Sequence, residues 1–214
     1  MSRTQTLSQL RKQVLVVVIR GDARKEGLQA SKACIAGGIS AVEVAYTNPD
    51  AGLIISDLCT EYKENPEVLI GAGTVLDSVT ARQAIMAGAT YIVSPSFNDE
   101  VAKICNLYAV PYIPGCMTLT EITRALEAGC EMIKLFPGSV FGSKYISAIK
   151  APLPQVSIMV TGGVNAKNIS DWLVAGADAV GIGGEFNQLA AQGHFDRIQD
   201  MAKIYVSLAD SCKK

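Results

Sequence analysis

The sequence predicts a closed barrel of eight parallel strands, each followed by a helix, which is the (β/α)₈ or TIM-barrel class of α/β folds. Eight short apolar runs recur along the 214 residues, and amphipathic stretches of helical period separate most of them. Hydrophobic residues make up 49% of the chain and aromatic residues only 6%, a mixture typical of buried parallel strands. An Ala-Gly pair also precedes four of the runs, where glycine can end a helix.

The strands are expected at regular intervals from end to end. Their residues are 14–20, 40–46, 67–73, 89–95, 110–115, 131–137, 156–163 and 177–184. Strands that alternate with helices favour a parallel sheet, and eight repeats favour its closure into a barrel. No linker or change of composition divides the chain, so we expect residues 1–214 to form a single domain.

Helices are expected between the strands and in the tail that follows His194. Asp77-Ser78 is a typical helix start, and Thr118 with Glu121 three residues later has the spacing of a capping box. The predicted helix ends, with glycine in the left-handed conformation, are the Ala-Gly pairs at 36–37, 87–88, 128–129 and 175–176.

Charge and cysteine usage exclude several classes of protein. The net charge is −1 and no long basic run occurs, so neither a nucleic acid nor a membrane surface is an expected partner. The six cysteines form no CxxC pair and have no histidine nearby in sequence, so we expect free thiols and no metal site. The apolar run at 14–19 is too short for a signal peptide or a membrane span, and a cytoplasmic enzyme is expected.

Two charged residues interrupt strands that should be buried. Glu43 stands in Ala-Val-Glu-Val-Ala and Lys134 in Met-Ile-Lys-Leu-Phe, where an unpaired charge costs several kcal/mol. They could be surface residues on a sheet edge, although a closed barrel has no edge, or a buried structural ion pair. The functional interpretation is that an apolar site favours the neutral amine of Lys134, which can then attack a carbonyl. Glu43 in the same interior could move protons.

Glycine-rich strand ends give a second functional signal. Thr161-Gly162-Gly163 ends the seventh strand and residues 181–184 end the eighth, the two positions where such barrels usually bind phosphate with backbone N–H groups. The third strand ends in Gly-Ala-Gly-Thr at 71–74, which we expect to let a ligand approach the backbone. A purely structural role as turn glycines stays open. The only histidine, His194, is expected on the surface.

Taken together, these residues resemble the class I KDPG/KHG aldolase family. The resemblance runs from about Val14 to the C-terminal helix. It rests on Val42-Glu43-Val44, Gly71-Ala72-Gly73-Thr74-Val75, Ser94-Pro95, Pro114-Gly115, Lys134-Leu135-Phe136-Pro137, Thr161-Gly162-Gly163-Val164 and Gly181-Ile182-Gly183-Gly184.

The resemblance implies a lyase that needs no metal or other cofactor, forms a homotrimer and acts on a small 2-oxo acid. Such an enzyme cleaves 2-dehydro-3-deoxy-6-phosphogluconate (KDPG) to pyruvate and glyceraldehyde 3-phosphate, and/or 4-hydroxy-2-oxoglutarate (KHG) to pyruvate and glyoxylate. By resemblance, Lys134 is the Schiff-base lysine and Glu43 the general acid and base. The substrate-binding candidates at the strand ends are Thr74, Pro95, Phe136, Thr161, Gly162, Gly163, Gly183 and Gly184.

Two positions depart from the family pattern. Many members have an arginine four residues after the glutamate, where it grips the substrate carboxylate, but here that residue is Thr47. We expect the carboxylate to rest on hydroxyl and backbone groups or on Arg20, at the end of the first strand. Members that bind phosphate often have a serine after the last glycine pair, where this chain has Glu185. Its charge repels phosphate unless it points away.

Two alternative functions remain open on the sequence. A phosphosugar isomerase or epimerase could use the same barrel, but the predicted strands offer no histidine for its proton transfers. A catalytically inactive 2-oxo acid binding protein is the other alternative. The presence of both Glu43 and Lys134 argues against it.

Overall fold

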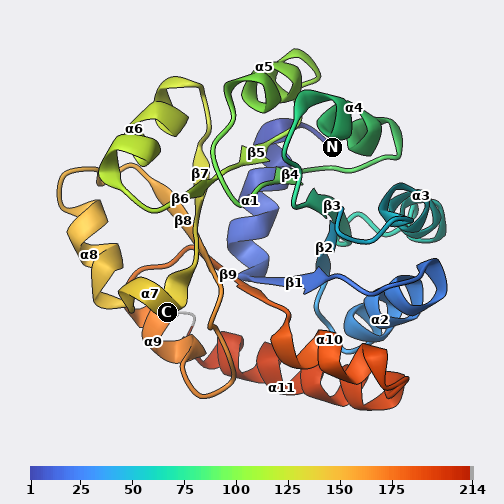
Figure 1. Cartoon of the computed structure of the whole chain (residues 1–214). Coiled ribbons are helices and arrows are strands. Elements are labelled where there is room, and N and C mark those ends of the chain that lie inside the picture. The colour runs from blue at the N-terminus through green and yellow to red at the C-terminus, as the bar shows by residue number, and fades with distance from the viewer. Residues whose placement is uncertain (213–214) are drawn as a thin grey trace.

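The computed structural model describes residues 1–212 and forms a parallel barrel surrounded by helices (Figure 1). All eight predicted strands are confirmed, each shorter than its apolar run. The strands are β1 Leu15–Ile19, β2 Ala41–Ala45, β3 Leu69–Gly73, β4 Ile92–Val93, β5 Tyr112–Ile113, β6 Gly115–Cys116, β7 Met132–Leu135, β8 Ser157–Thr161 and β9 Ala179–Ile182.

The sheet closes on itself at Pro114. Its strand order is β5-β4-β3-β2-β1-β9-β8-β7-β6, and neighbouring strands are parallel. The elements β5 and β6 are the two halves of the predicted fifth strand, separated by Pro114, which has no N–H to give to a ladder. The two ends of the sheet therefore belong to one stretch of chain. This closure rules out a sheet-edge position for Glu43 and Lys134.

Most helices lie outside the strands and cover them (Figure 1). Within residues 1–212, no helix combines the length and the apolarity that a bilayer crossing requires. The helices are α1 Arg3–Gln13, α2 Arg24–Ala36, α3 Ala51–Glu61, α4 Ser78–Met86, α5 Asp99–Leu107, α6 Leu119–Glu127, α7 Gly138–Phe141, α8 Lys144–Lys150, α9 Ile169–Val174, α10 Gly184–Ala191 and α11 Phe195–Cys212.

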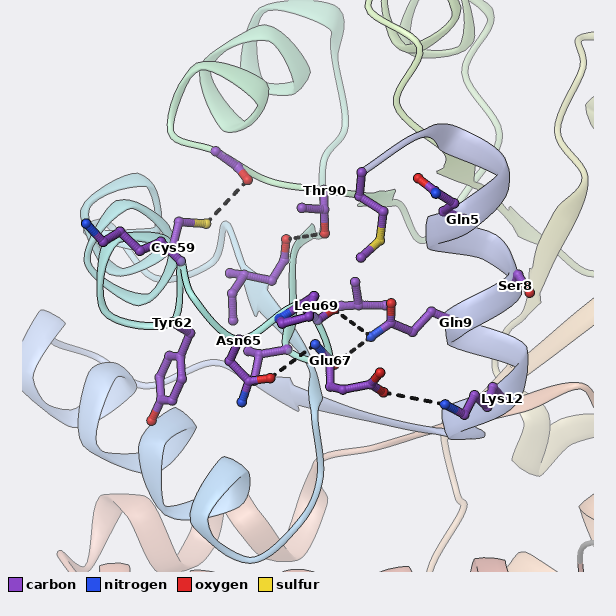
Figure 2. A pocket seen from close by; sticks show the side chains of 16 residues that line it. Gln5, Ser8, Gln9, Lys12, Cys59, Tyr62, Asn65, Glu67, Leu69 and Thr90 are labelled. Carbon is purple, nitrogen blue, oxygen red and sulfur yellow. Dashed lines mark hydrogen bonds and ion pairs between the residues drawn. The ribbon is translucent and has the colours of Figure 1, made fainter.

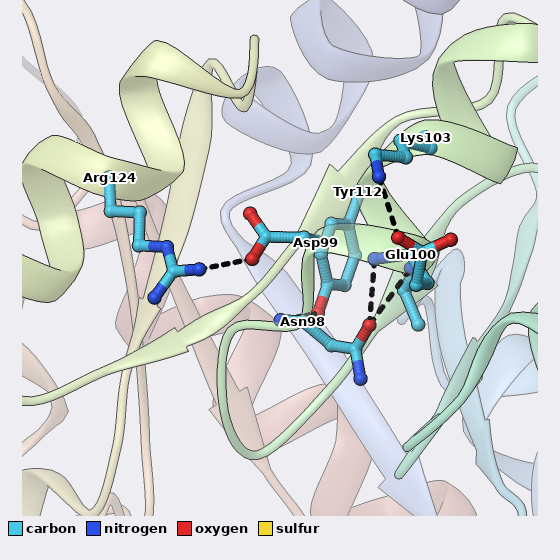
Figure 3. Close-up of polar contacts among 7 residues, drawn as sticks. Asn98, Asp99, Glu100, Lys103, Tyr112 and Arg124 are labelled. Carbon is cyan, nitrogen blue, oxygen red and sulfur yellow. Dashed lines mark hydrogen bonds and ion pairs between the residues drawn. The ribbon is translucent and has the colours of Figure 1, made fainter.

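The two predicted helix starts are confirmed. The carboxylate of Asp77 accepts a hydrogen bond from the Thr80 N–H at the start of α4, and Thr118 forms a capping box with Glu121 at the start of α6. A third cap is Asn98, whose side-chain oxygen accepts from the first-turn N–H groups of α5 (Figure 3). These side chains satisfy N–H groups that have no partner inside their helices.

Glycine ends three of the four helices as predicted, with φ between +83° and +104°. These glycines are Gly88, Gly129 and Gly176. The prediction is wrong for Gly37, which has φ −83°, while the next residue, Gly38, takes the left-handed conformation with φ +98°. Gly37 instead serves close packing, because a Cβ there would lie 2.4 Å from the Cβ of Ala202 on α11.

Helix α1 covers the N-terminal end of the barrel and was not predicted. Figure 1 shows it behind the ring of strands. Its Leu7 and Leu10 are fully buried in one cluster with inward residues such as Leu69 and Met132. The helix begins with a capping box between Ser2 and Gln5, a spacing that was readable in the sequence. Because α1 fills this end, the inward side chains meet solvent at the carboxyl ends of the strands.

Candidate active site

The two charged residues that interrupt the strands meet inside the barrel. Glu43 comes from the second strand of the ring and Lys134 from the sixth, and these strands stand opposite each other in a closed ring of eight. The Nζ atom of Lys134 lies 3.4 Å from Oε1 of Glu43. Lys134 is 6% exposed and Glu43 is 0% exposed. Both side chains are therefore buried, and each has the other as its partner, because a buried charge needs a partner of opposite charge.

Glycines on β3 make room for Glu43. A Cβ at Gly73 would lie 2.1 Å from Oε1 of Glu43, and a Cβ at Gly71 would lie 2.4 Å from the ring of Tyr91. The expectation that these glycines let a ligand approach the backbone is therefore corrected. The space above them is filled by two side chains of the protein itself.

A pocket of about 530 Å³ opens beside Lys134 at the carboxyl ends of β1, β8 and β9. The ring of Phe136 forms part of its wall, with its centre 5.2 Å from Nζ of Lys134. A structural ion pair needs no adjoining cavity, whereas a reactive amine does. The buried pair thus has the access that a carbonyl compound would need.

Most of the predicted substrate-binding residues line this pocket, and three do not. Thr47 is exposed in the loop after β2, and Thr74 follows β3 with a positive φ of +57°. The carbonyl oxygen of Pro95 lies against Gly115, and Gly115 is the residue that pairs with Lys134 in the sheet. The predicted residues that line the pocket are Arg20, Phe136, Thr161, Gly162, Gly163, Gly183, Gly184 and Glu185.

The glycine end of the pocket can receive an anion. Helix α10 begins at Gly184, and the first N–H groups of any helix lack partners inside it and carry partial positive charge. A Cβ at Gly184 would meet no atom within 4 Å, so the backbone faces open space there. Gly162 and Gly163, with φ +85° and +87°, form the facing loop. Backbone N–H groups at such a place suit a phosphate or a carboxylate.

Arg20 is the cation at the rim of the pocket, and an asparagine that sequence reasoning missed holds its backbone. The Oδ1 atom of Asn187 accepts from the Arg20 N–H at 2.8 Å, while its Nδ2 donates to the Val18 carbonyl at 2.8 Å. Asn187 thus ties α10 to the end of β1. The guanidinium of Arg20 is exposed and makes no hydrogen bond or ion pair with any residue between 1 and 212. It is therefore available to a ligand anion.

The carboxylate of Glu185 is held by a residue of the last helix. The Tyr205 hydroxyl donates to Oε2 of Glu185 at 2.9 Å. Burial, and secondarily this contact with Glu185, raises the pKa of Tyr205. The two residues stand on α10 and α11, twenty positions apart, so no local pattern in the sequence predicts their contact.

Several buried polar atoms around Lys134 have no hydrogen-bond partner within residues 1–212. They are Oε2 of Glu43, the Tyr91 hydroxyl and Oγ1 of Thr161. Burial and the charge of Glu43 raise the pKa of Tyr91 well above its ordinary value. Native proteins rarely leave such atoms unpaired, and three of the six such atoms within residues 1–212 belong to Glu43, Tyr91 and Thr161, which supports a functional site here.

Other titratable residues lie away from this site. The six cysteines are free thiols, four of them buried. His194 is exposed just before α11, as predicted. In the described part of the chain, no group of three or more His, Cys, Asp and Glu side chains is arranged to hold a metal ion.

Known proteins resemble this chain over nearly its whole length. The family model described as KDPG and KHG aldolase matches residues 7–201. The 2-dehydro-3-deoxy-6-phosphogalactonate aldolase of Escherichia coli K12 is 36% identical over 172 residues, which are 80% of this chain and 83% of the relative. The 2-dehydro-3-deoxy-phosphogluconate aldolase of Treponema pallidum is 34% identical over 193 residues, which are 88% and 90% of the two chains.

A solved structure is similar in three dimensions. It is the KDPG aldolase of Legionella pneumophila, with pyruvate captured at low pH as a covalent carbinolamine intermediate. Its TM-score is 0.81 at 28% identity, and the match covers 89% of this chain and 92% of that one. The residues matched by the family model, 7–201, include the strands that carry Glu43 and Lys134.

Proposed function

This chain belongs to the KDPG and KHG aldolase family and is a carbon–carbon lyase, and we propose that it cleaves 2-oxo-4-hydroxy acids through a Schiff base on Lys134. The proposed reactions are KDPG to pyruvate and glyceraldehyde 3-phosphate, and/or KHG to pyruvate and glyoxylate. The observation that carries the proposal is the buried Lys134 amine, 3.4 Å from a carboxylate and beside an open pocket. Neither an isomerase nor an inactive binding protein requires that combination.

The first step makes Lys134 a nucleophile. Moving one proton from its ammonium group to the Glu43 carboxylate, 3.4 Å away, leaves a neutral amine beside a carboxylic acid. The amine adds to the C2 carbonyl of the substrate and forms a carbinolamine. Glu43 returns its proton to the carbinolamine hydroxyl, which leaves as water and gives an iminium ion beside the Glu43 carboxylate. The face of the Phe136 ring, whose centre lies 5.2 Å from Nζ of Lys134, suits a cation at this place.

Bond cleavage then uses the iminium as an electron sink. Glu43, as a carboxylate, takes the proton of the C4 hydroxyl while the C3–C4 bond breaks. The electron pair of that bond flows to the iminium nitrogen and gives an enamine. The aldehyde leaves, Glu43 returns a proton to C3, and hydrolysis releases pyruvate and the free amine.

The far end of the pocket is proposed to bind the rest of the substrate. Contacts for anionic groups are offered by the N–H groups at Gly183 and Gly184 and by the loop at Gly162 and Gly163. The Arg20 guanidinium, which has no partner within residues 1–212, offers another. The hydrogen bond from Tyr205 supports a position of the Glu185 carboxylate that leaves room for phosphate. Thr47, Thr74 and Pro95 stay predicted contacts on the other side of the Lys134 amine.

The assembly is proposed to be a homotrimer in the cytoplasm, with residues 1–214 acting as one domain. Large apolar side chains are exposed on α4 and α5, two helices in contact, among them Val79 (67%), Met86 (70%) and Leu107 (73%). A patch of this kind is typical of protein interfaces. Six cysteines without a disulfide suit a reducing compartment. Light scattering should give three times the chain mass of 22.6 kDa.

Borohydride reduction in the presence of pyruvate tests the Schiff base directly. The expected result is a stable gain of mass on the peptide that contains Lys134. Lys12, an exposed lysine at the opposite end of the barrel, provides the matched control. The Lys12→Ala variant should keep the adduct and Lys134→Ala should lose it. An adduct on another lysine, or none, contradicts the proposed function.

A pyruvate-release assay then chooses among substrates. It should include KDPG, its C4 epimer and their unphosphorylated counterparts, with Glu185→Ser in parallel. We expect the phosphorylated acids to have the lower KM, and Glu185→Ser to change that preference little. A preference for unphosphorylated acids that Glu185→Ser reverses would show that Glu185 excludes phosphate.

A further inference from the structure

Tyr91 is a buried phenol that the proposed reaction does not use. It precedes β4, is 0% exposed, and its ring lies against Gly71. Its hydroxyl has no hydrogen-bond partner within residues 1–212. A phenylalanine would fill the same space without burying a hydroxyl, so packing alone does not explain the tyrosine.

Glu43 is the charged residue that interacts with this phenol. Gly71, which supports the Tyr91 ring, is the residue paired with Glu43 between β2 and β3. The charge of Glu43 contributes to the raised pKa of Tyr91, so the two groups interact electrostatically. Only one oxygen of the carboxylate has a partner: Oε1 faces Lys134, whereas Oε2 has no hydrogen-bond partner among the described residues. A donor without an acceptor and an acceptor without a donor thus lie in the same interior.

We propose that Tyr91 is a positioning residue that donates a hydrogen bond, through one bridging water, to Oε2 of Glu43. This inference rests on the proposed function, in which Glu43 moves protons. With Oε2 held from the side of the fourth strand, Oε1 stays directed at Lys134 and at C3 and C4 of the substrate. The bond also stabilises the carboxylate form that takes the C4 hydroxyl proton.

Tyr46 offers a matched comparison. Its hydroxyl is also buried and without a partner among the described residues, so the same atom can be removed at a second site. It faces Gly52 on α3, and burial alone raises the pKa of Tyr46, with no contribution from Glu43. Removing this hydroxyl therefore relieves an unpaired group without touching the proton-moving carboxylate.

The test measures exchange of the pyruvate methyl protons with deuterated water, which isolates proton transfer at C3. Tyr91→Phe should slow this exchange by about tenfold or more, the size expected when a reacting carboxylate loses a charged hydrogen bond. The KM for pyruvate and the yield of borohydride adduct on Lys134 should stay unchanged. Tyr46→Phe should exchange at the wild-type rate.

The outcomes separate this inference from the function beneath it. If wild-type protein neither exchanges the methyl protons nor forms the adduct, the proposed function fails. If the wild type does both and Tyr91→Phe exchanges as fast as Tyr46→Phe, only the positioning role is overturned. A rise in melting temperature for Tyr91→Phe with unchanged exchange would identify the hydroxyl as an unpaired group without a role.

Discussion

The two ends of the barrel differ in how they treat polar groups. The N-terminal end has the larger hollow, about 710 Å³, between α1 and the loop before β3 (Figure 2). There Nε2 of Gln9 donates to the carbonyls of Pro66 and Glu67, and Lys12 lies 3.7 Å from Glu67. The smaller pocket, at the C-terminal end, adjoins the buried Lys134 and Glu43, and Oε2 of Glu43 has no hydrogen-bond partner within residues 1–212. A buried charged pair beside a cavity, more than the volume of the cavity, distinguishes the site.

This difference has a physical cause. Side chains at the N-terminal end stabilise the fold, and most polar groups there are paired or in water, which keeps their cost low. The exceptions on α1 are Nε of Arg3 and Oε1 of Gln13, which are buried without a hydrogen-bond partner among residues 1–212. At the C-terminal end the barrel keeps a charged pair out of water, at a cost in stability that a purely structural part of the protein would not retain. Substitutions at the two ends should therefore separate activity from stability.

The largest effect is expected at Lys134. Lys134→Ala should lower the rate of pyruvate release by about 10⁴-fold or more, because the covalent route is gone. Lys12→Ala, at the opposite end, should leave kcat unchanged. Steady-state assays measure kcat of both variants. Comparable losses of kcat in the two would contradict the assignment of catalysis to the C-terminal end alone.

The next effect is expected at Glu43. Glu43→Gln keeps the shape of the side chain but removes the base, so kcat should fall by about 10²- to 10⁴-fold. Trapping of pyruvate by borohydride should be slower, because Glu43 no longer takes the ammonium proton, but the adduct should still form on Lys134. The exposed Glu67 gives the control, since Glu67→Gln should retain full activity. Full activity of Glu43→Gln would leave the carboxylate with a structural role alone.

Leu10 tests the N-terminal end. Leu10→Ala removes a 0% exposed side chain of α1 and should reduce the free energy of unfolding by about 3 kcal/mol. Urea denaturation measures this loss, and kcat of the folded protein should stay at the wild-type value. Val174→Ala, at an 81% exposed position on α9, should change stability by less than about 0.5 kcal/mol. A fall in kcat for Leu10→Ala would mean that α1 shapes the site.

The smallest effect is expected at Asp77, which caps α4 at the site end of the barrel. The hydrogen bond from the Thr80 N–H lowers the pKa of Asp77 below its ordinary value of 3.8. The stabilisation is therefore present above about pH 4 and is lost as the pH falls through the lowered value. Asp77→Ala should cost about 1 kcal/mol at pH 7, and less in acid. Asp77→Asn, which can still accept the bond, should remove this pH dependence.

The sequence was most informative where the signal was local. Eight apolar runs predicted eight strands, and a charge inside a run identified Glu43 and Lys134, because burial of charge leaves a mark on a single strand. The capping box of α1 was equally local but was missed. Sequence reasoning missed three features that depend on residues far apart in the chain. They are the contact of Tyr205 with Glu185, the hydrogen bonds of Asn187 to the end of β1, and the packing of Tyr91 against Gly71. The glycines of β3 were misinterpreted, because a sequence does not tell whether a ligand or a side chain fills the space above a glycine.

Helix α1 affects how substrates enter the barrel and how products leave it. Because Leu7 and Leu10 of α1 close the N-terminal end of the barrel, the interior opens to solvent only at the C-terminal end. Substrates that reach Lys134 and products that leave it therefore use the same opening. In the proposed reaction the aldehyde stands above the three-carbon fragment that stays bonded to the lysine. The order of product release, aldehyde first and pyruvate last, then follows from the architecture.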